Sequence, residues 1–409
     1  MGHWQTLEKR RKNDACAQKS GKARKIWLFR RIMNHDLFQR WEDALRQRKD
    51  LGLYRELKAT LAPVDFSSND YLGLARSPIL LERVERAFVS LQSEHKLGST
   101  GSRLISGHHV CFEETEAAIA KIHLAESALL FNTGYMANLA LFSTLPQKGD
   151  TVLYDELSHA CIKDGIRLSL AARFPFLHND LASLEAKLKK ATGQAFVAVE
   201  SVYSMDGDEA PLAQLVELCA QYEALLIVDE AHSTGIMGES GNGSVCAKGL
   251  QEKIPIRMHT YGKALGCHGA AVVGPKELKP YLINFARPFI YTTAMPLHGV
   301  VSIREAYAYL AEEGRSLQMK LHENIRSFNA LLKDAPNKIG SESAIHALLF
   351  PGNEQTVQKA KFLQSKGFDV RPVLSPTVKK GSERLRICLH AYNSIEEIEH
   401  LCQAIGEGS

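Results

Sequence analysis

The sequence has 409 residues, of which 45% are hydrophobic, so the chain can bury large cores. Its longest apolar runs are too short to cross a bilayer, which takes about 20 residues, and we expect no membrane insertion. The eight cysteines include no Cys-x-x-Cys pair. Their scatter argues against a zinc site or another metal site and against a disulfide framework, and it favours a reducing, cytoplasmic location.

The formal net charge of +4 originates in the first residues of the chain. Residues 1–31 hold ten lysines and arginines against two acidic residues, which leaves 40 basic and 44 acidic residues in the remainder. The arm lacks the apolar stretch of a secretory signal. We predict that residues 1–33 form a disordered extension. Because the basic excess is confined to this arm, we predict no nucleic-acid partner.

The rest of the chain is predicted to form three parts. Residues 34–64, with the amphipathic stretch Phe38–Leu45, read as an amino-terminal helical segment. Residues 65–297 alternate apolar strands with helices such as Leu181–Leu188, which is typical of a mostly parallel sheet covered on both faces. In residues 298–409 a long helical stretch (Val300–Leu321) precedes strands at Ala344–Phe350 and Arg384–Leu389, which indicates a smaller α+β domain.

Several apolar strands of the large domain end in polar residues. The strand that begins at Ser127 breaks at Gly134 and Tyr135 into a helix, whose free backbone N–H groups can bind a phosphate. His159 follows a strand that begins at Thr151, and Ser204 follows one that begins at Ala195. Because the carboxyl ends of parallel strands meet at one edge of the sheet, these residues are predicted to line a common crevice.

The strongest chemical signal comes from the next two strand ends. The run Leu225–Asp229 places a carboxylate at the sheet edge with His232 just beyond, and Thr260 and Lys263 follow downstream in His-Thr-Tyr-Gly-Lys. Pyridoxal 5'-phosphate needs an amine for a Schiff base, a carboxylate beside its pyridine nitrogen and donors for its phosphate. A Gly-Lys dipeptide alone is usually an exposed lysine, but with Asp229 upstream the pattern favours a site for this cofactor.

Four runs in the same order resemble the α-oxoamine synthases, which condense an amino acid with an acyl thioester. They are Asp65-Phe-Ser-Ser-Asn-Asp-Tyr-Leu-Gly73, Glu200-Ser-Val-Tyr-Ser-Met-Asp-Gly-Asp208, Asp229-Glu-Ala-His-Ser-Thr-Gly235 and Thr260-Tyr-Gly-Lys263. The resemblance runs from about Asp36 to the carboxyl terminus. It implies an α/β fold of the fold-type I pyridoxal-phosphate transferases, similar to aspartate aminotransferase, and a homodimer with sites at the subunit interface.

The resemblance also implies roles for the cofactor residues. Lys263 corresponds to the lysine that binds the cofactor, and Asp229 to the partner of its pyridine nitrogen. His159 would stack on the ring, while Ser204 and His232 would bind the phenolic oxygen. The phosphate would be bound by Thr260, Gly134 and Tyr135.

For the substrates, the resemblance assigns Asn69 and Arg386 to the amino-acid carboxylate and Thr377 to the acyl pocket. Arg55 would correspond to the family's substrate-binding arginine near the amino terminus. A guanidinium binds a carboxylate through two parallel hydrogen bonds and keeps its charge at any working pH, which suits Arg386 to this role. Arg384 faces the same side of the predicted strand, and the choice between the two arginines depends on the family alone.

Three further stretches resemble the branch of the family that joins L-alanine to a pimeloyl thioester, with loss of carbon dioxide and thiol, in biotin synthesis. They are Phe176-Leu-His-Asn-Asp180, Asn284–Pro296 and Ser375-Pro-Thr-Val378. Two alternatives stay open: a sister synthase that uses glycine or serine with another acyl-CoA, such as 2-amino-3-oxobutyrate or serine palmitoyl synthesis, and a fold-type I aminotransferase. The acyl carrier, coenzyme A or an acyl carrier protein, also stays open.

Overall fold

The computed structural model describes residues 35–57, 63–91 and 97–407 of the chain. The chain separates into two units, residues 1–60 and residues 61–409. The described part of the first unit contains helix α2 (His35–Asp50), in the segment predicted to be helical. Phe38 and Trp41 pack edge to face on this helix, with ring centroids 5.1 Å apart.

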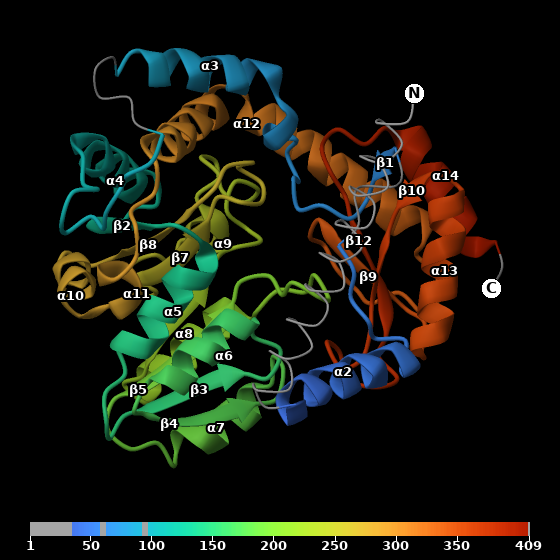
Figure 1. Ribbon diagram of the computed structural model, residues 1–409, viewed down its shortest axis with the longest axis horizontal. Helices are drawn as coiled ribbons and strands as arrows, with labels where there is room; N and C mark the ends of the chain where they lie inside the picture. Colours follow the sequence, from blue (N-terminus) through green and yellow to red (C-terminus); the bar gives the residue numbers. More distant parts are fainter. Residues whose placement is uncertain (1–34, 58–62, 92–96, 408–409) are drawn as a thin grey trace, which may run out of the picture. The chain divides into compact units, whose positions relative to one another are not determined.

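A seven-stranded sheet forms the centre of the second unit (Figure 1). Its order is β2-β8-β7-β6-β5-β3-β4; β8 is antiparallel to both neighbours and the other pairs are parallel. This confirms the predicted mostly parallel sheet. The strands are β2 (Ser127–Phe131), β3 (Thr151–Asp155), β4 (Ala172–Phe176), β5 (Ala195–Glu200), β6 (Leu225–Asp229), β7 (Ile256–Thr260) and β8 (Ala270–Gly274).

The central strands of this sheet are buried on both faces, which explains their nearly continuous apolar sequences, whereas the edge strand β4 is largely exposed. Along β5, Phe196 and Ala198 enter one hydrophobic cluster, while Val197 and Val199 enter another. The first cluster includes side chains of α5, α6 and α10, and the second includes side chains of α7 and α8. The helices of this part are α4 (Val110–Ile122), α5 (Gly134–Thr144), α6 (Ala160–Leu168), α7 (Leu181–Leu188), α8 (Leu212–Gln221), α9 (Gly243–Ala247), α10 (Leu278–Phe285) and α11 (Arg287–Ile290).

The long helix α12 (Leu297–Leu331) connects this layer to the carboxyl-terminal part (Figure 1). It packs against α3 (Pro78–Val89), α4 and α14 (Ile395–Gly406). Strands β11 (Arg371–Val373), β12 (Arg384–Cys388) and β9 (Ile345–Leu349) form an antiparallel sheet with α13 (Asn353–Ser365) beside it.

The segment before the 3-10 turn η1 (Leu74–Arg76) lies along the carboxyl-terminal part of the chain. Strand β1 (Val64–Asp65) pairs in parallel with β10 (Phe368–Asp369), and the backbone N–H of Cys388 donates to the Phe66 carbonyl oxygen. One large hydrophobic cluster therefore joins residues of this segment, α12 and the small sheet. The domain boundaries themselves stay predictions.

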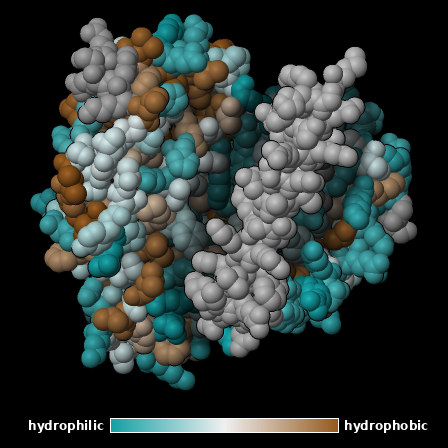
Figure 2. All heavy atoms as spheres, in the orientation of Figure 1, coloured by the Kyte–Doolittle hydropathy of each residue, from teal (hydrophilic) through white to brown (hydrophobic). Residues whose placement is uncertain are grey.

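On the face seen in Figure 2, hydrophobic side chains are scattered among hydrophilic ones. Within the described ranges, no helix is long and apolar enough to cross a membrane. The same ranges contain no group of three or more histidine, cysteine or acidic side chains that could hold a metal ion. Their seven cysteines are free thiols.

Candidate active site

The carboxyl ends of β6 and β7 bring the predicted lysine and histidine together. His232 lies in the turn that follows β6, and Lys263 lies in the turn that follows β7. The Lys263 Nζ atom is 2.7 Å from His232 Nε2. Because adjacent parallel strands deliver their following turns to the same edge, two residues 31 positions apart in sequence become hydrogen-bonded neighbours.

The environment of Lys263 favours its neutral form. Desolvation lowers the pKa of this amine from 10.5 to about 8, although the charges of Asp229 and Glu200 oppose the shift. Desolvation and the neighbouring Lys263 charge also keep the pKa of His232 well below its usual range. A neutral His232 is therefore available to accept from Lys263, and a lysine that titrates near neutrality can act as nucleophile and base.

Asp229 is a buried carboxylate whose two oxygens are both oriented. Its Oδ2 accepts from Asn138 Nδ2 at 2.7 Å, and its Oδ1 accepts from the Ala231 backbone N–H at 2.8 Å. Desolvation raises the pKa of Asp229, while Lys263 counteracts the shift. A buried carboxylate is stable as an anion only beside a positive charge, so this position suits a protonated pyridine ring.

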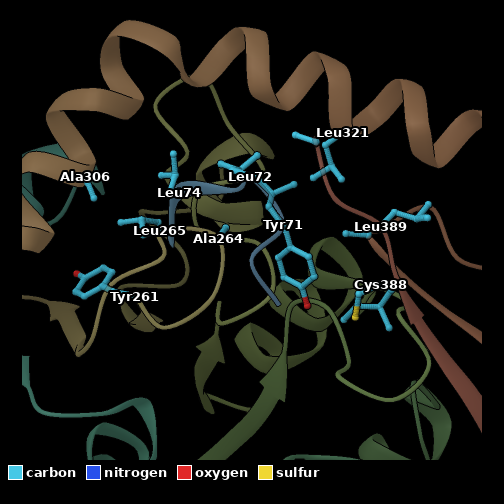
Figure 3. Packing of buried hydrophobic residues seen from close by; sticks show 14 of the residues in the cluster. Tyr71, Leu72, Leu74, Tyr261, Ala264, Leu265, Ala306, Leu321, Cys388 and Leu389 are labelled. Atoms are coloured by element: carbon cyan, nitrogen blue, oxygen red, sulfur yellow. The ribbon is translucent and has the colours of Figure 1, made fainter. Parts of the chain in front are cut away.

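A hydrogen-bond chain leads from the lysine to the predicted carboxylate-binding residues. The Tyr71 hydroxyl lies 2.8 Å from His232 Nδ1 and donates to Asn69 Oδ1 at 2.9 Å. Arg386 Nη2 donates to the same Asn69 oxygen at 2.9 Å. In one consistent assignment, Lys263 donates to His232, His232 to Tyr71 and Tyr71 to Asn69. Figure 3 shows the Tyr71 ring among the residues of the core cluster, with its hydroxyl pointing away from helix α12.

The predicted phosphate end lies where α5 begins. Gly134 is the first residue of α5, and a Cβ atom built on it would lie 3.2 Å from both Cβ and Oγ1 of Thr260. Tyr135 is exposed on the same turn and donates through its hydroxyl to Asp164. The free N–H groups of a helix amino terminus, next to a threonine hydroxyl, make a site that fits a phosphate.

His159 is the N-cap residue of α6. Its Nδ1 accepts from the Cys161 backbone N–H at 3.2 Å, which fixes the ring, and the residue is exposed. The buried carboxylate of Glu200 accepts from the His159 backbone N–H. An oriented imidazole with an accessible face suits the predicted stacking role. With Asp229, Lys263 and the α5 terminus, the residues fit pyridoxal phosphate.

The structure distinguishes the two arginines that sequence left equivalent. Arg384 forms an ion pair with Asp206 and is buried. Arg386 instead reaches Asn69, and its Nε donates to the carbonyl oxygen of Ser204 at 2.6 Å. Of these two arginines, Arg386 therefore extends the hydrogen-bond chain that begins at Lys263. Ser204 lies beside Arg386.

Two further residues, Thr377 and Arg55, were predicted to bind the substrates. Thr377 is exposed in the connection between β11 and β12. Arg55 is exposed and belongs to the first unit of the chain. Their assignment to the substrates stays a prediction.

Three residues of the site did not figure in the sequence prediction: Tyr71, Asn138 and Glu200. Tyr71 and Glu200 stood inside recognised runs, and Glu200 is the register partner of Asp229 in the sheet, so its position at a strand end was a usable signal. Asn138 lies one turn into α5. Nothing in its helical sequence context indicates that its amide reaches Asp229.

Comparison with known proteins decides the family. Residues 62–405 match the model of the family described as aminotransferase class I and II. The chain belongs to this family. It is 41% identical over 387 residues to the 8-amino-7-oxononanoate synthase of Emericella nidulans, across 89% of this chain and 93% of that protein.

Two solved structures are similar to this chain. An 8-amino-7-oxononanoate synthase from Francisella tularensis aligns with a TM-score of 0.73 and 29% identity, over 84% of this chain and 97% of that one. A serine palmitoyltransferase variant from S. paucimobilis, with a bound adduct of PLP and myriocin, aligns with a TM-score of 0.81 and 27% identity, over 90% and 96%. The predicted α-oxoamine synthase family and fold-type I architecture are confirmed.

Proposed function

We propose that this chain is a pyridoxal-phosphate-dependent acyltransferase that joins L-alanine to a pimeloyl thioester. The products are 8-amino-7-oxononanoate, carbon dioxide and free thiol, and the reaction belongs to biotin biosynthesis. The observation that carries the proposal is the continuous connection from Lys263 through His232, Tyr71 and Asn69 to Arg386. This connection supports a shared site for a base and a carboxylate, and relatives of 36–41% identity include proteins named for this activity.

The binding end of the site selects an amino acid. The Arg386 guanidinium donates to the Ser204 carbonyl, to Asn69 and to Cys388 Sγ, and its positive charge can pair with a carboxylate. Its charge is permanent. A carboxylate bound there directs the α-carbon of the same molecule toward Lys263.

The reacting end moves a proton. When bound, pyridoxal phosphate supplies an electron sink for negative charge at the α-carbon. Asp229 would hold its carboxylate toward the pyridine nitrogen, and the His159 ring would cover one face of the cofactor. Lys263, with a pKa of about 8, removes the α-proton as a neutral amine and returns a proton after decarboxylation. His232 keeps the Nζ atom in place throughout.

We extend the proposal to a homodimer. Residues 99–107 and 291–295 are neighbours, since the Ala294 N–H donates to the Gly101 carbonyl and Ser99 Oγ donates to the Met295 carbonyl. Both segments expose large apolar side chains, with Ile105 at 85% and Tyr291 at 73% exposure. Such a surface is typical of an interface between subunits. We further propose that the enzyme acts in the cytoplasm, with coenzyme A or an acyl carrier protein as carrier.

A second candidate is a sister synthase that condenses L-serine with a long-chain acyl thioester. The structural similarity to a serine palmitoyltransferase, with a TM-score of 0.81, favours this candidate. The proposed carboxylate site and lysine could serve either amino acid. The candidates differ in the acyl pocket and in the space beside the α-carbon.

Thiol release distinguishes them. The purified holoenzyme is assayed with L-alanine, glycine and L-serine, each crossed with pimeloyl, acetyl, succinyl and palmitoyl thioesters, and Lys263→Ala is the blank. Highest kcat/KM for alanine with the pimeloyl thioester supports the proposal. A preference for serine with palmitoyl thioester supports the second candidate and overturns the first.

A further inference from the structure

His178 lies outside the site and forms an ion pair on each side of its ring. Its Nδ1 lies 3.0 Å from Asp155 Oδ1, and its Nε2 lies 2.7 Å from Asp208 Oδ2. Asp155 is the last residue of β3 and is fully buried, whereas Asp208 belongs to the loop after β5. One imidazole therefore ties the end of a central strand to a loop.

That loop is a short hairpin formed by residues 202–209. Val202 and Glu209 form an antiparallel bridge, and the Gly207 N–H donates to the Tyr203 carbonyl at 2.9 Å. Gly207 has a φ of 78°, and a Cβ atom there would lie 2.0 Å from the Ile345 carbonyl oxygen. The hairpin thus packs closely on β9.

The opposite side of the hairpin contacts the substrate arginine. The Ser204 carbonyl accepts from Arg386 Nε, Asp206 pairs with Arg384, and the Gly207 carbonyl accepts from Ser341 Oγ at 2.9 Å. A displacement of the hairpin would therefore move the acceptor that orients the Arg386 guanidinium.

We propose that His178 is a positioning residue that, by binding Asp155 and Asp208 at once, holds the 202–209 hairpin against Arg386 and so sets the affinity for the amino-acid carboxylate. The inference deepens the proposed function and rests on it for the identity of that ligand. His178 itself touches neither Arg386 nor Lys263 in this arrangement; it acts through the hairpin.

The charge of His178 supports the proposal. Desolvation lowers the pKa of this imidazole, but the hydrogen bonds and charges of the two carboxylates outweigh it and raise the pKa to about 9. His178 is therefore a cation at neutral pH, and both contacts are charge-assisted. The titratable groups that face it are Asp155, Asp208 and Tyr203, while Lys163 and Glu200 act on Asp155 electrostatically.

The test uses His178→Gln, which keeps a polar side chain without the charge. His108→Gln is the matched control, because His108 pairs with Glu113 at 2.9 Å on the surface. Each holoenzyme is titrated with L-alanine, glycine and L-serine, and the cofactor absorbance reports binding. Hydrogen exchange of the hairpin amides is measured in each apoprotein, which requires no substrate.

We expect His178→Gln to weaken binding of the preferred amino acid by about tenfold or more, the loss typical of a disturbed charge-assisted hydrogen bond. Cofactor affinity should fall by much less than amino-acid affinity, because Ser204 is the one predicted cofactor residue in the hairpin, and the hairpin amides should exchange faster. The difference from wild type should shrink as the pH rises through 9, because wild-type His178 loses its charge over this range. His108→Gln should match wild type throughout.

A double variant with Asp208→Asn separates positioning from general destabilisation. If His178 acts through Asp208, the effects of the two substitutions should not add. The double variant should then bind the amino acid no more weakly than whichever single variant binds it less tightly. Unchanged hairpin exchange in His178→Gln, or equal losses of cofactor and amino-acid affinity, would overturn the proposal. A wild-type enzyme that binds none of the three amino acids refutes the proposed function instead, and hairpin exchange alone then decides about His178.

Discussion

The titration of Lys263 gives a quantitative prediction for the apoprotein. At pH 8 a lysine with a pKa of about 8 is half neutral, whereas one with the ordinary value of 10.5 is neutral in roughly one molecule in 300. The neutral fraction of Lys263 is thus roughly 150-fold higher than that of an ordinary lysine. This fraction decides how fast the amine reacts with an aldehyde or takes up a proton.

Two substitutions should move this pKa in opposite directions. The Asp229 charge raises the pKa of Lys263 and the Arg386 charge lowers it. Asp229→Asn should therefore lower the midpoint below 8, and Arg386→Gln should raise it. Because both variants remove one charge from the same pocket, each is the control for the other.

The assay is pulse labelling of the apoprotein amines between pH 6 and 11, with the Lys263 peptide quantified by mass spectrometry. Each profile is scaled to its own plateau, so limited access to the buried amine does not affect the midpoint. Exposed Lys320 reports the reactivity of the reagent. A Lys263 midpoint near 10.5, or shifts in the same direction for both variants, would refute the reasoning.

Three further predictions concern binding and stability. Arg386→Lys keeps the charge but loses the planar pair of donors, so KM for the amino acid should rise by roughly 10- to 100-fold with a smaller change in kcat; an unchanged KM contradicts this. Gly134→Ala places a methyl group 3.2 Å from Thr260 Oγ1 and should weaken cofactor binding by about 1 kcal/mol, whereas Gly98→Ala, with nothing within 4 Å, should not. Because the folded-state pKa of His178 is raised from 6.5 to about 9, its stabilisation is present below pH 6.5 and lost as pH rises through 9. In urea unfolding of the apoprotein, the free energy of unfolding of His178→Gln should be lower than that of wild type by about 1–2 kcal/mol at pH 6.5, a value reduced to allow for the partial exposure of His178. The difference should vanish as the pH rises past 9. A constant difference at all pH values would contradict the assignment.

The sequence predicted the large sheet and the polar ends of its strands because those depend on local patterns. The run Leu225–Asp229 is apolar until its final carboxylate, and it forms β6 with those bounds. Helix α7 likewise has the predicted bounds Leu181–Leu188, since Asp180 caps it through a side-chain hydrogen bond to the Ser183 N–H. Helix α12 extends to Leu331, ten residues beyond the expected stretch, because Ile325 and Phe328 remain buried against the large cluster.

The connections between strand ends could not be predicted without the fold. The choice of Arg386 over Arg384 depends on which guanidinium faces Asn69, a residue 317 positions away in sequence. The double pairing of His178 depends on β3 lying between β4 and β5, which brings the segments after these three strands together. Motif spacing gives the residue types of such a site, but long-range register decides which of them meet.

The fate of the alanine carboxyl carbon distinguishes a decarboxylating condensation from transamination. The holoenzyme is supplied with L-alanine labelled at its carboxyl carbon and with a pimeloyl thioester, and released carbon dioxide, thiol and amino ketone are measured together. The proposed condensation predicts labelled carbon dioxide, thiol and 8-amino-7-oxononanoate in equal amounts, and none of the three products in Lys263→Ala. Conversion of alanine to pyruvate, with its amino group passed to the cofactor and then to an added 2-oxo acid while the thioester stays intact, would contradict the proposed function and identify an aminotransferase.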